Sequence, residues 1–126
     1  MKVEIKAVRK TENQVHVIFS TAIGNGAAIW KDGPPEIGEE WEVELEINDE
    51  FVYGENAKGA QEFYCLSMEK DTLNLNARLA SIAEDGIAVI DIKETNVMID
   101  LTGCSSNPPT FINLSFKSLN LYPVYL

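Results

Sequence analysis

Alternation of apolar and polar residues is the feature that most limits how this chain can fold. It is clearest over residues 40–47, where apolar side chains occupy one face of an extended segment and glutamates occupy the other. The apolar positions there are Trp41, Val43, Leu45 and Ile47. A period of two indicates a half-buried β-strand, whereas an amphipathic helix needs a period near 3.6. The pattern recurs from end to end, so we expect an all-β chain without helices.

About ten such stretches follow one another along the 126 residues, separated by Gly, Pro, Asn and Asp. The clearest hairpin is predicted over residues 73–92, where Asp85-Gly86 lies between two apolar runs. Many short strands with regular turns favour a sandwich or two tandem small barrels of the OB or SH3-like kind. The length suits a single domain.

The same order of elements occurs twice, which suggests a duplication. Each half holds a hairpin, a short apolar strand, a Pro-Pro loop, an alternating strand and a last short strand. The two loops contain Pro34-Pro35 and Pro108-Pro109. We expect one all-β domain over residues 1–126, built as a pseudo-duplication of residues 1–55 and 73–124. Repeated hairpins that resemble one another by chance are the alternative.

The net charge of the chain limits the classes of partner that it is expected to bind. Ten Lys and Arg stand against twenty Asp and Glu, which gives a net charge of -10. A field of this sign repels phosphate backbones and anionic lipid surfaces, and the basic residues are scattered. We therefore expect neither nucleic-acid nor membrane binding. The first residues lack the apolar run of an export signal, and no stretch approaches the roughly 20 apolar residues of a membrane span. These observations predict a cytoplasmic protein.

Residue sets for catalysis or metal binding are sparse. His16 is the single histidine, so a hydrolase would need it beside Ser20 or Cys65. A lone histidine in a strand is more often a surface or interface residue. Cys65 and Cys104 are far apart and are expected to be free thiols. Three Cys and His residues in total provide no zinc site, and no glycine-rich loop leads into a helix that could hold a phosphate. We expect no enzyme activity, no catalytic residues, no metal and no cofactor.

The glutamates of residues 40–47 form the least ordinary surface. Residues on one face of a strand lie about 6.6–6.8 Å apart, so this row spans roughly 20 Å. Further acidic residues flank it, and the predicted partner-binding set includes Glu36, Glu39, Glu40, Glu42, Glu44, Glu46, Asp49 and Glu50. The row either keeps an edge strand from pairing with other molecules or docks a basic protein partner.

Aromatic anchors would complete such a docking surface. Trp30, next to the Pro-Pro loop, is expected to be exposed and joins the predicted set, whereas Trp41 is expected in the core. The apolar residues 121–126 are either a packed last strand or a segment that joins a partner's sheet edge, which leaves a homodimer open. We predict a non-catalytic protein-binding module, specifically an acidic inhibitor or immunity-type protein that docks a basic toxin or nuclease. The alternative is a small-ligand-binding or structural β domain.

Overall fold

The computed structural model describes residues 1–125, which form twelve β-strands and no helix. The predicted all-β, barrel-like fold is confirmed. The strands are β1 (Lys2–Lys10), β2 (Val15–Thr21), β3 (Gly24–Trp30), β4 (Glu40–Glu46), β5 (Glu50–Val52), β6 (Ala57–Gly59), β7 (Cys65–Glu69), β8 (Thr72–Ile82), β9 (Ile87–Asp91), β10 (Asn96–Thr102), β11 (Thr110–Phe116) and β12 (Asn120–Pro123). The short strand β6 pairs with β11.

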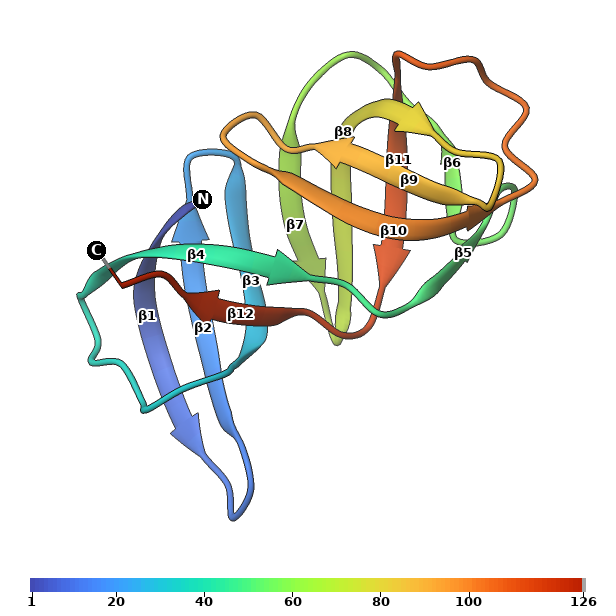
Figure 1. The fold of residues 1–126 in the computed structure, drawn as a ribbon. Helices are drawn as coiled ribbons and strands as arrows, with labels where there is room; N and C mark the ends of the chain where they lie inside the picture. The colour runs from blue at the N-terminus through green and yellow to red at the C-terminus, as the bar shows by residue number, and fades with distance from the viewer. Residues whose placement is uncertain (126) are drawn as a thin grey trace.

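Five strands close into a small barrel, which we call the first barrel. β1 pairs antiparallel with both β2 and β4, β2 pairs antiparallel with β3, and β12 closes the ring between β3 and β4. The pairing of β12 with β3 is parallel, and that with β4 is antiparallel. Figure 1 shows β12, near the end of the chain, lying beside β4.

The remaining strands form a second curled sheet, which we call the second sheet. β8 pairs with β9 and β11, β9 pairs with β10, and β5 adds to β10 in parallel. β6 pairs with β11 at the other end, and a bridge between Tyr53 and Ala57 brings the two ends of this sheet together. The two units lie side by side in Figure 1.

The two units therefore exchange their fifth strands. β5 follows the first four strands in the sequence but pairs in the second sheet, and β12 follows β11 but closes the first barrel. The pairing order otherwise repeats, with β1 to β4 matching β8 to β11. Even the irregularities match, since the register shifts once in β1, between Ile5 and Ala7, and once in β8, between Leu79 and Ser81. A duplication as the origin of this repeat stays a prediction.

One hydrophobic core runs through both units. In the second sheet, Phe51 of β5 packs edge to face against Phe116 of β11, with 6.1 Å between the ring centroids. β7 joins the units, because it pairs with β8 and touches β3 at Gly24. Gly24 has a φ of +141°, and a Cβ atom there would collide with the carbonyl oxygen of Leu66. Residues 1–125 contain no helix that is long and apolar enough to cross a membrane.

Candidate functional site

The predicted glutamate row exists on the outer face of β4. Glu40, Glu42 and Glu44 are exposed and Glu46 is half-buried, while Val43 between them is buried in the core. The strand is not an edge, because β1 pairs with it on one side and β12 on the other. Protection of a free sheet edge is therefore not the role of these charges.

The protein itself occupies part of the row. Lys2 Nζ lies 2.9 Å from Glu40 Oε2, and the Met1 amino group lies 2.7 Å from Glu42 Oε2. The hydrogen bond and charge of Glu40 raise the pKa of Lys2 above its ordinary value. Exposed ion pairs of this kind stabilise little. They do reduce the negative charge that Glu40 and Glu42 offer to a partner.

Glu46 is held by neutral donors. Asn120 Nδ2 donates to Glu46 Oε1 at 2.9 Å, and Asn48 Nδ2 and the Tyr122 hydroxyl donate to the same oxygen. The hydrogen bonds from Asn120 and Asn48 lower the pKa of Glu46, so this carboxylate stays charged. Glu44 differs from the other three, since within residues 1–125 it has no ion pair and no side-chain hydrogen bond.

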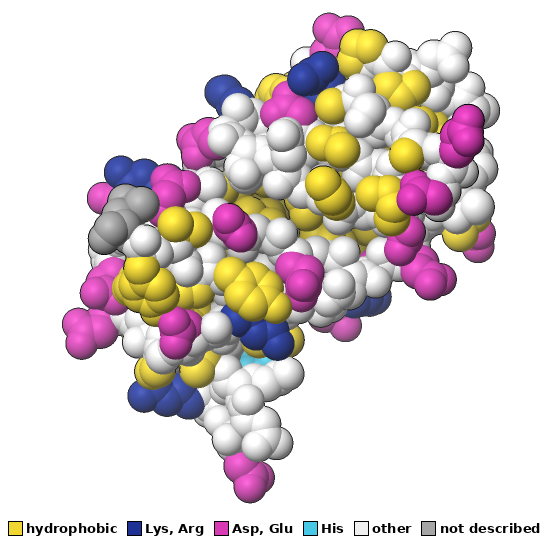
Figure 2. Space-filling view, in the orientation of Figure 1, with side chains coloured by type: hydrophobic (Ala, Val, Ile, Leu, Met, Phe, Trp, Pro, Cys, Tyr) yellow, Lys and Arg dark blue, Asp and Glu magenta, His cyan; other side chains and the backbone are white. Residues whose placement is uncertain are grey.

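Glu44 borders a hollow of about 530 Å³ between the two units. We call this the acidic hollow; its lining includes Glu44, Glu46, Asn48, Asn96, Met98 and Tyr122. Met98 projects from β10 and is 67% exposed, and Tyr122 projects from β12 and is 38% exposed. On the face that Figure 2 shows, acidic side chains lie among apolar patches. The structure thus places exposed apolar side chains beside Glu44, the glutamate of the row that has no ion pair or side-chain hydrogen bond within residues 1–125.

The flanking acidic residues do not join this hollow. Glu39 Oε1 accepts hydrogen bonds from the Glu36 amide and from Trp41 Nε1, in the loop before β4. Asp49 Oδ2 accepts a hydrogen bond from the Lys117 amide, and Glu50 lies in β5, opposite Asp100 of the second sheet. The predicted set therefore splits into separate groups. Only Glu44 and Glu46 of the set line the hollow.

The predicted exposure of Trp30 is wrong. Its side chain is 3% exposed, because β3 lies between β2 and β12 and Trp30 points into the barrel. Trp30 Nε1 donates to the Gly33 carbonyl at 3.0 Å. Trp41, expected in the core, is half-buried and packs edge to face between Trp30 and Tyr125. Met98 and Tyr122, which were not in the predicted set, are instead the exposed apolar side chains near Glu44.

The last predicted segment closes the first barrel. β12 is paired on both sides, so it offers no free edge to a partner's sheet. Tyr125 beyond it is 66% exposed, and its hydroxyl donates to Asp32. This hydrogen bond raises the pKa of Tyr125 and lowers that of Asp32. Leu126 lies outside the described residues.

A second hollow, of about 550 Å³, lies between the outer face of β1 to β3 and two turns of the second sheet. We call it the basic groove; its lining includes Arg9, His16, Ile18, Ala27, Ile29, Lys70, Asp71 and Lys117. It was not predicted from the sequence, because only the fold brings Lys70 and Lys117 to the hairpin that carries Arg9 and His16. One signal was available, since His16 and Ile18 lie on the outward face of an alternating strand, where a charged residue would be more usual.

The hydrolase candidates do not meet. His16 and Ser20 share the outer face of β2 but are four residues apart, so their Cα atoms are about 13 Å apart. Cys65 lies in β7 and does not line the hollow that His16 borders. Cys65 and Cys104 are free thiols and half-buried. Within residues 1–125 there is no group of three or more His, Cys, Asp or Glu that could hold a metal ion.

Comparison of the chain with protein-family models, with curated proteins and with solved structures gives no match.

Proposed function

We propose that this protein is a binding module whose acidic hollow docks a basic protein. The observation that carries the proposal is the position of Glu44, which has no partner within residues 1–125 and lies beside the exposed side chains of Met98 and Tyr122. Carboxylates select a basic partner and speed its encounter, whereas apolar contacts provide most of the affinity. A surface that has both can hold a specific segment.

The proposed occupant is a loop or strand that carries a Lys or Arg next to an apolar side chain. The cation would pair with Glu44, and the apolar side chain would pack against Tyr122 and Met98. Glu46 supports this arrangement, because its three donors keep it charged and fixed in position. The net charge of -10 adds long-range attraction for a basic protein.

The finer form of the proposal is an inhibitor or immunity-type protein for a basic toxin or nuclease. Such a protein would present carboxylates where the enzyme otherwise binds phosphates. It predicts that the captured partner is a nuclease and that its activity falls when this protein is added.

The test compares Glu44→Lys with Glu12→Lys. Both variants change an exposed glutamate to lysine, but Glu12 lies in the turn between β1 and β2. Proteins retained by the immobilised wild type at about 0.15 M salt are identified. The binding of each purified candidate is then measured by calorimetry. We expect Glu44→Lys to weaken binding by at least about tenfold, because like charges at an interface repel.

Glu12→Lys should bind the same partner as the wild type does. Both variants should keep the wild-type melting temperature, since substitutions at exposed positions change stability little. A partner that binds Glu44→Lys as tightly as the wild type would contradict the proposal.

A further inference from the structure

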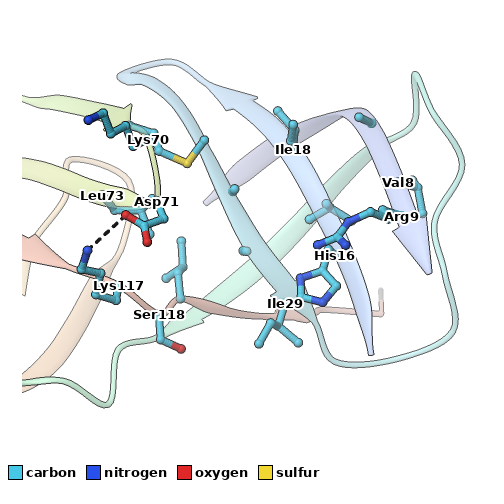
Figure 3. Close-up of a pocket in the computed structure, with 16 residues that line it drawn as sticks. Val8, Arg9, His16, Ile18, Ile29, Lys70, Asp71, Leu73, Lys117 and Ser118 are labelled. Atoms are coloured by element: carbon cyan, nitrogen blue, oxygen red, sulfur yellow. Dashed lines mark hydrogen bonds and ion pairs between the residues drawn. The ribbon is translucent and has the colours of Figure 1, made fainter. Parts of the chain in front are cut away.

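Arg9 brings an unpaired positive charge to one end of the basic groove. Arg9 of β1 and His16 of β2 are paired residues, and both point outward from the barrel. Figure 3 shows their side chains over the same part of the groove. Within residues 1–125, Arg9 has no ion pair and neither side chain has a hydrogen bond. A guanidinium group always carries its charge, and in a chain of net charge -10 an unpaired one is notable.

On the opposite wall of the groove, one of the two lysines is already paired. Lys117 Nζ lies 3.1 Å from Asp71 Oδ1, and this pair lowers the pKa of Asp71. Lys70 also lines the groove and has no ion pair within residues 1–125, but its side chain extends away from Arg9 and His16 in Figure 3. An anion that enters the groove would therefore find its partner at the Arg9 end.

The floor between the two ends is apolar. Ile18 is 46% exposed, and Ala27 and Ile29 of β3 are half-buried beside it. The volume of about 550 Å³ suits a small organic molecule rather than a protein side chain or a simple ion.

We propose that the basic groove binds a small organic monocarboxylate with an apolar body. The carboxylate would accept hydrogen bonds from the Arg9 guanidinium, whose planar fork matches its two oxygens, and from His16. The apolar body would cover Ile18 and Ile29. A singly charged head suits this end of the groove, because one guanidinium cannot offset a phosphate, Lys70 extends away from it, and the whole molecule repels multiply charged anions.

This site is separate from the proposed docking function. The basic groove is built on β1, β2 and β3 and the turns after β7 and β11, whereas the acidic hollow is built on β4, β10 and β12. No residue lines both. Failure of one proposal therefore leaves the other intact.

The single histidine of the chain makes the first test direct. Decanoate is titrated into the protein, and the ring resonances of His16 are followed by NMR at constant pH. We expect a saturable shift below about 1 mM decanoate. Decyltrimethylammonium, which has a similar tail and the opposite charge, should bind at least about tenfold more weakly. This comparison needs no variant.

Variants then assign the contacts. Arg9→Gln should weaken decanoate binding by about tenfold or more, since it removes a charge-assisted hydrogen bond, and Ile18→Gln should weaken it through loss of the apolar contact. Lys58→Gln removes an exposed lysine of β6 outside the groove and should bind as the wild type does.

Three results would overturn the proposal. The first is the absence of a saturable shift up to about 1 mM decanoate. The second is equal binding of the cation and the carboxylate, or of Arg9→Gln and the wild type. The third is a shift of the His16 resonances with protein concentration alone, which would identify a second copy of the chain as the occupant.

Discussion

The outer faces of β1 and β4 in the first barrel and of β8 and β11 in the second sheet hold matching positions, yet they carry different polar groups. The first carries the glutamate row and is open to solvent. The second carries amides and hydroxyls and is crossed by residues 60–64, which connect β6 to β7. The same arrangement of strands thus forms a solvent-exposed surface in the first barrel and supports a crossing segment in the second sheet.

The support depends on Asn76, whose side chain is buried. Its Nδ2 donates to the carbonyls of Gln61 and Phe63, both at 3.1 Å, and its Oδ1 accepts from Asn113 Nδ2 at 3.2 Å. Tyr64 adds a second attachment, since its hydroxyl donates to Asp91 Oδ2 at 2.7 Å. The crossing segment supplies backbone groups that need partners, and amides provide them. The glutamates of the first barrel, in contrast, anchor no crossing segment like residues 60–64 within the described part of the chain.

The largest expected effect is that of Asn76→Leu. Leucine has a similar size but leaves two carbonyls and the Asn113 amide without this partner, so we expect a loss of about 2–3 kcal/mol in the free energy of unfolding. Chemical denaturation measures it. Glu44→Gln on the open face is the matched control and should change stability by less than about 0.5 kcal/mol. Equal stabilities for the two variants would refute the contrast between the faces.

A smaller effect is expected for Tyr64→Phe, which removes one hydroxyl and keeps the ring against Phe111. We expect a loss of about 1 kcal/mol at neutral pH. Burial raises the pKa of Asp91. The hydrogen bonds from Tyr64, the Lys93 amide and Arg78 outweigh this effect and leave the pKa below its ordinary value. The advantage of the wild type is therefore present above the ordinary pKa of an aspartate and should shrink as the pH falls through the lowered one. An advantage that did not depend on pH would show that Asp91 is not the source.

The smallest effect concerns Glu46 on the open face. Its lowered pKa means that its stabilising contribution is present above the pKa of an unfolded glutamate and is lost as the pH falls through the folded value. Glu46→Gln removes this titration but keeps an oxygen that accepts from Asn120. We expect the melting temperatures of wild type and variant to converge on acidification. Divergence at low pH would contradict the assignment.

Local patterns predicted most strands, because alternation and turn residues act over a few positions. The strand of residues 40–47 and the hairpin at Asp85-Gly86 lie where they were expected. The parallel pairings of β12 with β3 and of β5 with β10 could not be read in this way, since they join segments that are far apart in the sequence. The predicted exposure of Trp30 was wrong for the same reason, because its burial depends on the pairing of β12 with β3.

The candidate sites were predictable only in part. The glutamate row follows from alternation, but the ion pairs that occupy Glu40 and Glu42 depend on how β1 lies beside β4. The basic groove was hidden, because Lys70 and Lys117 are far along the sequence from the hairpin that carries Arg9 and His16. Their meeting is a property of the packing of the two units.

The exchange of the fifth strands has a consequence for synthesis. A ribosome releases the chain from its N-terminus, and a contiguous domain can fold while later residues are still being made. The first barrel cannot close in this way, because its fifth strand is β12, at residues 120–123. The apolar and aromatic side chains that line the interior of β1 to β4 therefore remain exposed to solvent until nearly all of these 126 residues have been translated. Ribosome-bound nascent chains that stop before β12 should accordingly be sensitive to protease within residues 1–46.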